Sequence, residues 1–213
     1  MSIQATIPTT PTTVPSTAEE LKERFGDPNE LAADHRLAYI DAAAERFLAQ
    51  CPFVIVSTAD AEGRCDASPK GDPPGFIHVA DKHTVYLPDR AGNKMFQSIG
   101  NILSNPHVGL LFLIPGEEWT MRINGRASIV DDPPLMEKLS ARGRPAQMAI
   151  KVDVQECYFH CPKSFKRAEL WNTERFHAYE GDSWGKILAQ RTKMGKDEAE
   201  QLDSMIEQAA QDL

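Results

Sequence analysis

A mainly β fold with flanking helices is predicted by three features of the sequence. Short stretches of β-branched and apolar residues recur every eight to twelve residues between residues 53 and 160. Turn residues separate these stretches, as in Asp60-Ala61-Glu62-Gly63 between the first two. Helical periodicity is concentrated before and after this region, with one helical segment interrupting it. This pattern is typical of a small barrel or sandwich.

The expected strands are residues 53–58, 64–70, 76–79, 84–87, 108–114, 119–129 and 148–160. Residues 108–114 are apolar on both faces, as in a central strand. Residues 119–129 alternate, which places Thr120, Arg122, Asn124 and Arg126 on one face. This polar row is either the solvated face of an edge strand or part of a binding site.

The expected helices are residues 35–50, 133–142, 163–171 and 197–213, one that begins at Ala18 and one from about Lys94 to Ser104. The first 17 residues are rich in Thr and Pro, which predicts a disordered tail. The predicted organisation is therefore a disordered tail (1–17), N-terminal helices (18–50), a strand-rich domain (51–175) and a C-terminal helical extension (176–213).

The charge of the chain limits its partners. It has 23 Lys and Arg against 31 Asp and Glu, a net charge of −8. This excess argues against nucleic acid or an anionic membrane surface as the main partner. No apolar run reaches the roughly 18 residues that a membrane span requires. We therefore expect a cytoplasmic protein that acts on a small molecule.

The four cysteines do not have the dense spacing of a disulfide framework. Cys157 and Cys161 would share one face of the last strand, with His160 on the other. Four strand steps put their sulfurs about 13 Å apart, too far for one zinc ion or one disulfide. We therefore predict no metal site.

Several polar residues at strand ends or on one strand face fit a site for a small dianion. They are Ser68, Lys70, Arg90, Asn93, Lys94, Arg122 and Arg126. Arg and Lys bind phosphate most strongly together with backbone N–H groups at a helix N-terminus. Gly92 would let the backbone approach the ligand closely. Taken singly, such residues are usually solvated charges or parts of an ordinary turn, so the prediction depends on their combination, and no side chain is assigned a catalytic role.

A series of ordered motifs resembles the FMN-binding split-barrel family related to pyridoxamine 5′-phosphate oxidase. The motifs are Cys51-Pro52-Phe53, Ser68-Pro69-Lys70-Gly71-Asp72, Leu87-Pro88-Asp89-Arg90-x-Gly-Asn-Lys94, Asn105-Pro106-His107-Val108-Gly109 and Arg122-x-Asn124-Gly125-Arg126. A later stretch resembles the C-terminal signature of the same subgroup, Phe159-His160-Cys161-x-Lys163-x-x-x-Arg167-x-x-Leu170-Trp171. The resemblance covers about residues 30 to 175.

The resemblance implies a six-stranded Greek-key split β-barrel over residues 51–175 and a homodimer with FMN at the subunit interface. It implies that Ser68, Lys70, Arg90, Asn93 and Lys94 surround the phosphate and ribityl chain, and that Arg122 and Asn124 lie near the flavin ring. It also implies that Lys163, Arg167 and Trp171 close the site from the partner subunit.

Two departures separate this chain from true pyridoxamine-phosphate oxidases. Cys65 stands where those enzymes carry a phosphate-binding arginine, and residues 201–213 lack their closing Arg-Leu-x-Pro signature. We therefore predict an FMN-dependent oxidoreductase that transfers hydride between flavin and a small molecule other than a B6 vitamer. The alternatives are a non-catalytic flavin carrier or redox sensor, a haem-binding split barrel with His78 or His160 as ligand, and a scaffold without a cofactor.

Overall fold

The structure is a computed structural model that describes residues 14–27, 35–90, 92 and 94–211. Residues 1–13 of the predicted tail, and the predicted site residue Asn93, lie outside the described residues. The chain forms two compact units, Met1–Trp171 and Asn172–Leu213. We call them the sheet unit and the C-terminal unit and describe each by itself.

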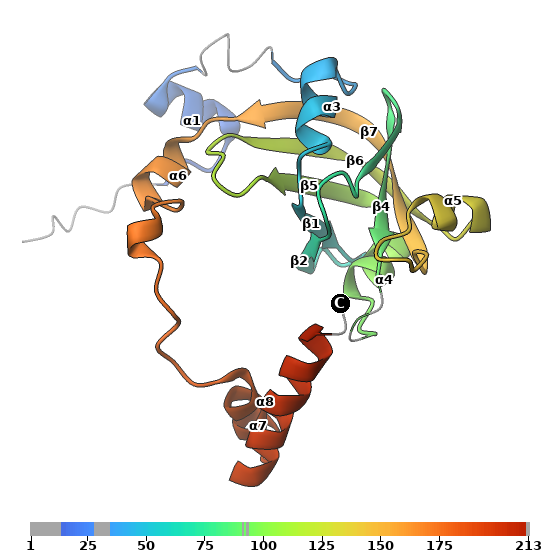
Figure 1. The fold of residues 1–213 in the computed structure, drawn as a ribbon. Coiled ribbons are helices and arrows are strands. Elements are labelled where there is room, and N and C mark those ends of the chain that lie inside the picture. The colour runs from blue at the N-terminus through green and yellow to red at the C-terminus, as the bar shows by residue number, and fades with distance from the viewer. Residues whose placement is uncertain (1–13, 28–34, 91, 93, 212–213) are drawn as a thin grey trace, which may run out of the picture. The chain divides into compact units, whose positions relative to one another are not determined.

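Seven antiparallel strands form one curved sheet in the sheet unit (Figure 1). They are β1 (Phe53–Ala59), β2 (Cys65–Gly71), β3 (His78–Asp81), β4 (Thr84–Asp89), β5 (His107–Leu113), β6 (Thr120–Val130) and β7 (Met148–His160). Their order across the sheet is β2-β1-β5-β6-β7-β4-β3. Within the described part of the chain β2 and β3 are not paired, so the sheet is open.

The predicted mainly β fold with flanking helices is confirmed. The sheet holds seven strands because the short strand β3 pairs with β4 as an edge hairpin. The six-stranded Greek-key split barrel that the resemblance implies stays a prediction.

The helices of the sheet unit are shorter than predicted. They are α1 (Ala18–Phe25), α3 (Ala42–Leu48), α4 (Gln97–Ser104), α5 (Pro133–Lys138) and α6 (Lys163–Ala168). The prediction of a helix from residue 35 is wrong, because Leu37 exchanges two backbone hydrogen bonds with Cys157 of β7 (3.0 and 2.7 Å). The predicted ends of α5 and α6 are also wrong. Arg142 and Glu169 adopt φ angles of 51° and 47°, which an α-helix does not contain.

Alternate residues of the strands form the core of the sheet unit. The side chains that point inward are fully buried, among them Val56 of β1, Phe112 of β5 and Ile123 of β6. Leu48 of α3 and Ile102 of α4 belong to the same cluster. Full burial of one such side chain stabilises the fold by about 1.5–3 kcal/mol. Burial of the sheet's inner face therefore fixes the strand register and leaves the polar rows at the edges and on the outer face.

The C-terminal unit is a pair of packed helices. They are α7 (Trp184–Thr192) and α8 (Lys196–Gln211), preceded by the 3₁₀ turn η1 (Thr173–Arg175). Asp203 of α8 accepts hydrogen bonds from the Ser183 hydroxyl and from the Gly185 N–H, which caps α7. The sequence predicted α8 but not α7, which is short and carries Gly185 in its first turn.

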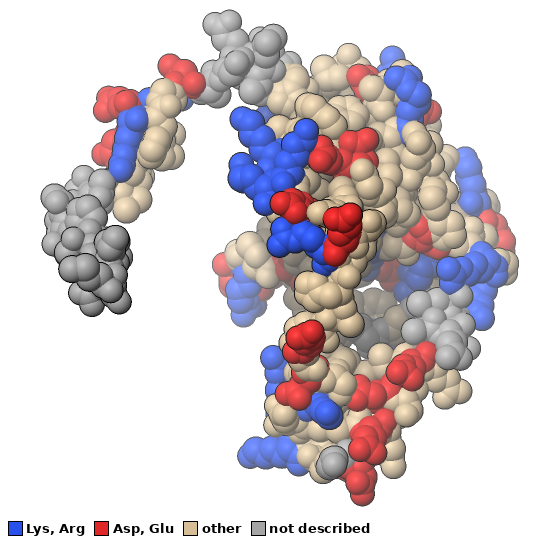
Figure 2. Space-filling model, turned by 60° about the vertical axis from the view of Figure 1, so that its left-hand side comes forward, with Lys and Arg blue, Asp and Glu red and all other residues tan. Residues whose placement is uncertain are grey.

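The surface carries charges of both signs, with one compact group of Lys and Arg side chains on the face shown in Figure 2. No helix among the described residues has the length and apolarity needed to cross a membrane.

Gly125 of β6 lies where the register of β6 and β7 shifts by one residue. A Cβ atom at this position would lie 2.2 Å from the Asp153 carbonyl oxygen. Two strands that pair this closely leave no room for a side chain, so only glycine fits.

We expect Gly125→Ala to destabilise the protein by about 1–3 kcal/mol, because the strands must move apart. Gly100 of α4 is the control: a Cβ there meets nothing within 4 Å. Gly100→Ala should stabilise the protein by about 0.5–1 kcal/mol, because Ala favours helix. Urea denaturation measures both, and equal changes in the two variants would contradict the assignment of the close contact.

Candidate functional site

Four of the predicted site residues line one hollow of the sheet unit. Ser68 and Lys70 lie on β2, Arg90 directly follows β4, and Lys94 precedes α4. The volume of about 520 Å³ is in the range of small-molecule sites. We call this the cationic hollow, and its lining is Cys65, Asp66, Ser68, Pro69, Lys70, Asp89, Arg90, Gly92, Lys94, Met95, Phe96, Gln97, Ser98 and Ile99.

Strand β2 supplies a polar row to this hollow. Asp66, Ser68 and Lys70 share one face because successive residues of a strand alternate. Lys70 pairs with Val54, which is fully buried, so this row faces inward. Pro69 is accommodated because β2 is an edge strand, where a missing N–H leaves no gap in the ladder.

Two ion pairs hold the cations at the hollow. Lys70 Nζ donates to Asp89 Oδ1 at 2.8 Å, and the Asp89 side chain is only 7% exposed. Arg90 Nε donates to Asp72 Oδ2 at 2.7 Å. Arg90 Nη1 is also buried, and within the described residues it has no hydrogen-bond partner. A buried N–H group without an acceptor is unfavourable, so this atom is suited to an anion from outside the chain.

Asp66 also lines the hollow, although it was not among the predicted site residues. Its Oδ2 accepts hydrogen bonds from Ser68 Oγ (2.8 Å) and from Ser98 Oγ of α4 (3.2 Å). The alternation of Asp66, Ser68 and Lys70 was the signal that could have identified it. The hollow therefore presents a carboxylate as well as cations.

Helix α4 does not begin at Lys94 as predicted. It begins at Gln97, because Lys94 and Phe96 adopt φ angles of 59° and 49°. The free N–H groups of the first turn thus lie three residues later along the chain than expected. Ser98, in that first turn, is buried and lines the hollow.

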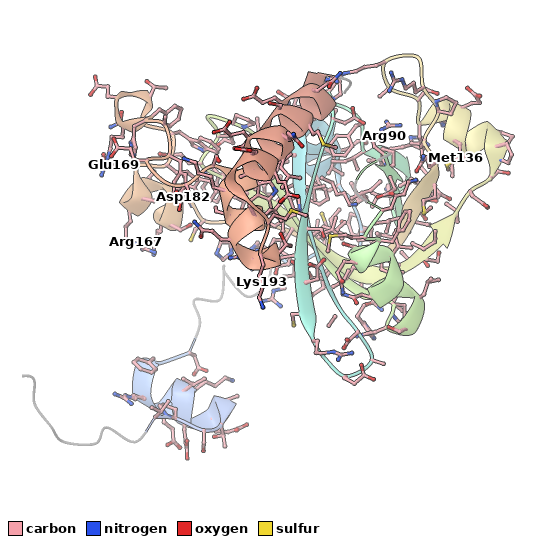
Figure 3. All side chains as sticks on the ribbon, turned by 90° about the horizontal axis from the view of Figure 1, so that it is seen from below. Arg90, Met136, Arg167, Glu169, Asp182 and Lys193 are labelled. Atoms are coloured by element: carbon pink, nitrogen blue, oxygen red, sulfur yellow. The ribbon has the colours of Figure 1, made fainter. Side chains whose placement is uncertain are left out.

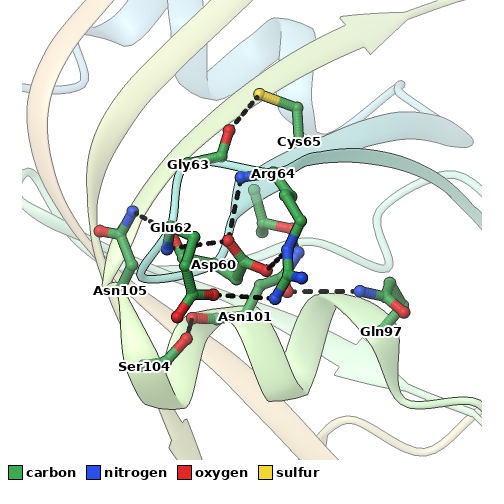
Figure 4. Close-up of polar contacts among 10 residues, drawn as sticks. Asp60, Glu62, Gly63, Arg64, Cys65, Gln97, Asn101, Ser104 and Asn105 are labelled. Atoms are coloured by element: carbon green, nitrogen blue, oxygen red, sulfur yellow. Dashed lines mark hydrogen bonds and ion pairs between the residues drawn. The ribbon is translucent and has the colours of Figure 1, made fainter.

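The turn between β1 and β2 anchors α4 against the sheet (Figure 4). Asp60 accepts hydrogen bonds from Glu62 N, Arg64 N and Arg64 Nε. These bonds from Arg64 lower the pKa of Asp60. Asn101 of α4 donates to Thr58 Oγ1 at 2.9 Å, and both residues are buried. The bond between Asn101 and Thr58 fixes α4, which provides one wall of the cationic hollow, against β1.

Arg122 and Asn124 do not line the cationic hollow. They lie on β6, with side chains on the opposite face from the core. Asn124 donates to Glu156 Oε2 at 2.7 Å, and this bond, with a smaller effect of Arg36, lowers the pKa of Glu156. Asn124 lines a separate outer depression of about 560 Å³. Cys65 and Asp66 line both spaces, so the two adjoin at the start of β2.

The remaining predicted site residues, Lys163, Arg167 and Trp171, belong to α6 and the segment after it. Trp171 Nε1 donates to the Glu117 carbonyl at 2.8 Å, which fixes this segment on the loop between β5 and β6. Figure 3 shows Arg167 far from Arg90, on the other side of the sheet unit. One chain therefore does not bring these residues to the cationic hollow.

Two cysteines are buried and two are exposed, and all four are free thiols. Burial raises the pKa of Cys157 to about 11, with a smaller contribution from the Asp41 charge. Burial also raises the pKa of Cys51. Cys65, at the junction of the two spaces, and Cys161 are exposed.

A family model described as pyridoxamine 5′-phosphate oxidase matches residues 40–161, more than half of the chain. The chain therefore belongs to the pyridoxamine 5′-phosphate oxidase family. Comparison with curated proteins gives no match.

Several solved structures are similar. A putative pyridoxamine 5′-phosphate oxidase from Lactobacillus delbrueckii is 18% identical with a TM-score of 0.45, over 57% of this chain and 95% of that one. An FMN-binding protein from Syntrophomonas wolfei is 9% identical with a TM-score of 0.41, over 55% and 88%. The heme storage protein HutZ from Vibrio cholerae is 13% identical with a TM-score of 0.38, over 57% and 93%. Because the identities are this low, the ligands named for these proteins are reported for those proteins only.

The burial of the thiols predicts their reactivity. At pH 8, a disulfide reagent such as 5,5′-dithiobis(2-nitrobenzoate) should modify Cys65 and Cys161 rapidly in the folded protein. Cys51 and Cys157 should react only after unfolding, because burial excludes the reagent and suppresses the thiolate. Peptide mass mapping checks the order, and fast modification of Cys157 would contradict the observed burial.

Proposed function

We propose that the protein is an FMN-dependent oxidoreductase and that the cationic hollow holds the FMN phosphate. One observation carries this proposal. Lys70, Arg90 and Lys94 line one hollow of a chain with a net charge of −8, and the Nη1 atom of Arg90 is buried without a partner among the described residues. A phosphate dianion would supply the missing acceptor.

In this proposal Arg90 and Lys94 bind the phosphate and Lys70 contributes charge from the floor of the hollow. The Ser68 hydroxyl, and Asn93 in the loop before α4, complete the contacts. Asp66 repels phosphate but accepts hydrogen bonds from hydroxyl groups, which suits the ribityl chain. The residues present therefore fit both a dianion and a polyol chain.

The flavin ring would extend from the hollow past Cys65 and Asp66 toward the outer depression. Arg122 and Asn124 lie on the face of β6 that this path reaches, and Glu156 orients the Asn124 amide. FMN supplies the hydride-transfer chemistry when bound, while the chain binds and orients it. We assign no catalytic side chain.

The proposal includes a homodimer, in which Lys163, Arg167 and Trp171 of one subunit close the site of the other. Within one chain these residues lie far from Arg90, so only a second subunit could bring them to the site. The outer sheet face also carries half-buried apolar residues, such as Ile55 of β1 and Leu111 of β5, which a partner would cover.

Removing the Arg90 guanidinium should greatly reduce the discrimination between FMN and riboflavin, which lacks the phosphate. Charge-assisted hydrogen bonds contribute about 1.5–3 kcal/mol, or roughly 10- to 150-fold in affinity. We expect the protein to bind FMN more tightly than riboflavin by this factor, and Arg90→Ala to remove most of the difference. Fluorescence titration with both flavins measures it.

Lys82→Gln is the control, since Lys82 is exposed and lies over the Tyr39 ring on another part of the sheet unit. It should leave both affinities unchanged, and circular dichroism should show that Arg90→Ala is folded. Equal affinity of the unaltered protein for FMN and riboflavin would contradict the phosphate site. A Soret band in the purified protein would instead favour haem.

Reduction kinetics test the enzymatic part of the proposal. An oxidoreductase should be reduced quickly and selectively by one donor among NADH, NADPH and a reduced deazaflavin in stopped-flow measurements of the flavin band. Slow and unselective reduction by all three would indicate a carrier or sensor.

A further inference from the structure

The C-terminal unit buries too little apolar surface to be stable by itself. Its helices α7 and α8 lie against each other (Figure 1), and among the described residues the only side chains that they bury are those of Ala189 and Ala199. The helices approach so closely that a Cβ atom on Gly185 would collide with the Ala199 carbonyl oxygen. Burial of two methyl groups does not offset the conformational entropy that two helices lose on folding. A further surface is therefore needed to stabilise the pair.

Large apolar side chains are exposed on one face of this helix pair. Trp184 of α7 is 55% exposed, and Met205 and Ile206 of α8 are 65% and 39% exposed. Leu188, one turn after Trp184, and Leu202, one turn before Ile206, are half-buried. The short connection makes the helices antiparallel, and around each helix the apolar stripe turns from the buried alanine toward the same side of the pair. We call these five residues the apolar face.

The two helices carry opposite charges. α7 has Lys186 and Arg191 and no carboxylate, whereas α8 has five carboxylates and one lysine. Among the residues that the structure describes, no salt bridge joins α7 to α8. Asp203 of α8 instead accepts hydrogen bonds from Ser183 and Gly185 at the start of α7. The opposite charges of the two helices therefore remain available to another molecule.

A second copy of the same unit matches the apolar face in both shape and charge. When a two-fold axis parallel to the helices relates two copies, α7 of each copy lies on α8 of the other, and a basic helix meets an acidic one. The other two-fold arrangement places α7 on α7 and α8 on α8, which brings like charges together and is unfavourable. Charge therefore selects the first arrangement.

Arg191 and Glu198 lie at the edges of the apolar face. Arg191 follows Leu188 by three residues, and Glu198 precedes Leu202 by four, so each lies next to an apolar stripe. Both are close to the connection between the helices, and a two-fold axis parallel to the helices keeps them at the same height. Glu198 Oε2 accepts a hydrogen bond from the Gly195 N–H, which leaves Oε1 for another donor. Arg191 of one copy thus faces Glu198 of the partner subunit.

We propose that two copies of the C-terminal unit join through the apolar face into an antiparallel four-helix bundle. Each α7 packs on α8 of the other copy, and an ion pair between Arg191 and Glu198 of the partner subunit lies on either side of the bundle. None of these residues belongs to the proposed flavin site, so this inference stands or falls separately from the proposed function.

Disulfide trapping in the full-length protein tests the contact. Cys65→Ser and Cys161→Ser remove the exposed native thiols, and Ile206→Cys then places one thiol in the apolar face. A disulfide forms only where two Cβ atoms approach to about 4 Å. We expect oxidation with copper phenanthroline to convert most of this variant to a covalent dimer on a non-reducing denaturing gel.

Ser204→Cys in the same background is the control, because Ser204 is exposed and lies about 200° around α8 from Ile206. It should give at least fivefold less covalent dimer. Equal yields from the two variants would mean that random collisions produce the dimer, and the proposal would be overturned.

Charge reversal tests which helices meet. Added to the Ile206→Cys variant, Arg191→Glu should lower the yield of covalent dimer at least fivefold, because it would face Glu198 of the partner subunit. Gln190→Glu is the matched control: it introduces the same residue in the same turn of α7 but outside the apolar face, and it should change the yield less than twofold. Circular dichroism should show that both variants are folded. An equal loss of dimer in the two variants would contradict the arrangement.

Reaction of the Ile206→Cys thiol with N-ethylmaleimide identifies any other cover of the apolar face. Protection from this reagent without formation of a covalent dimer would mean that another surface covers the face. Reaction as fast as that of Ser204→Cys, again without a dimer, would mean that nothing covers it. Either result overturns the proposal.

Discussion

Two ion pairs that connect β2 with β4 hold the candidate site together. β2 is first and β4 sixth in the order of the sheet, yet Lys70 and Asp89 are joined by a bond of 2.8 Å. The sheet therefore curls until these two strands approach each other. Arg90 and Asp72 make the second connection at the same place. Loss of one partner would leave a half-buried charge uncompensated, so the pairs fix both the curl and the positions of the cations.

The same pairs explain how an acidic chain can hold an anion. Asp89 and Asp72 use one N–H of Lys70 and one of Arg90, and the other donors stay available. Lys94 adds a charge from the loop before α4. This arrangement places part of Arg90 in a buried position where an unpaired N–H is unfavourable, which is the physical basis for expecting a ligand.

The strands were predicted well from the sequence. A strand with one buried face requires apolar and polar residues to alternate, and this alternation marks its position in the sequence. β7 has the predicted bounds. β1 ends one residue later than predicted, and β2 and β6 each begin and end one residue later. Helix ends were less predictable. His35 to Asp41 has helical periodicity, but backbone bonds between Leu37 and Cys157 prevent a helix there. Lys94 and Phe96 have left-handed backbone conformations that no simple composition rule reveals.

The predicted site residues that share one strand or one turn do meet at one hollow. The sequence did not indicate which residues the tertiary structure brings there from elsewhere. Ser68, Lys70, Arg90 and Lys94 meet at one hollow, whereas Asp66 entered it unpredicted through its bonds to Ser68 and Ser98. Arg167 lies far from Arg90 within one chain, and only the proposed second subunit would bring the two residues together.

A crystal structure of the protein with FMN tests the central claim most directly. The account predicts a phosphate oxygen about 2.7–2.9 Å from Arg90 Nη1, with Lys94 turned toward the same phosphate. A phosphate bound elsewhere, with Arg90 still contacting only Asp72, would contradict it.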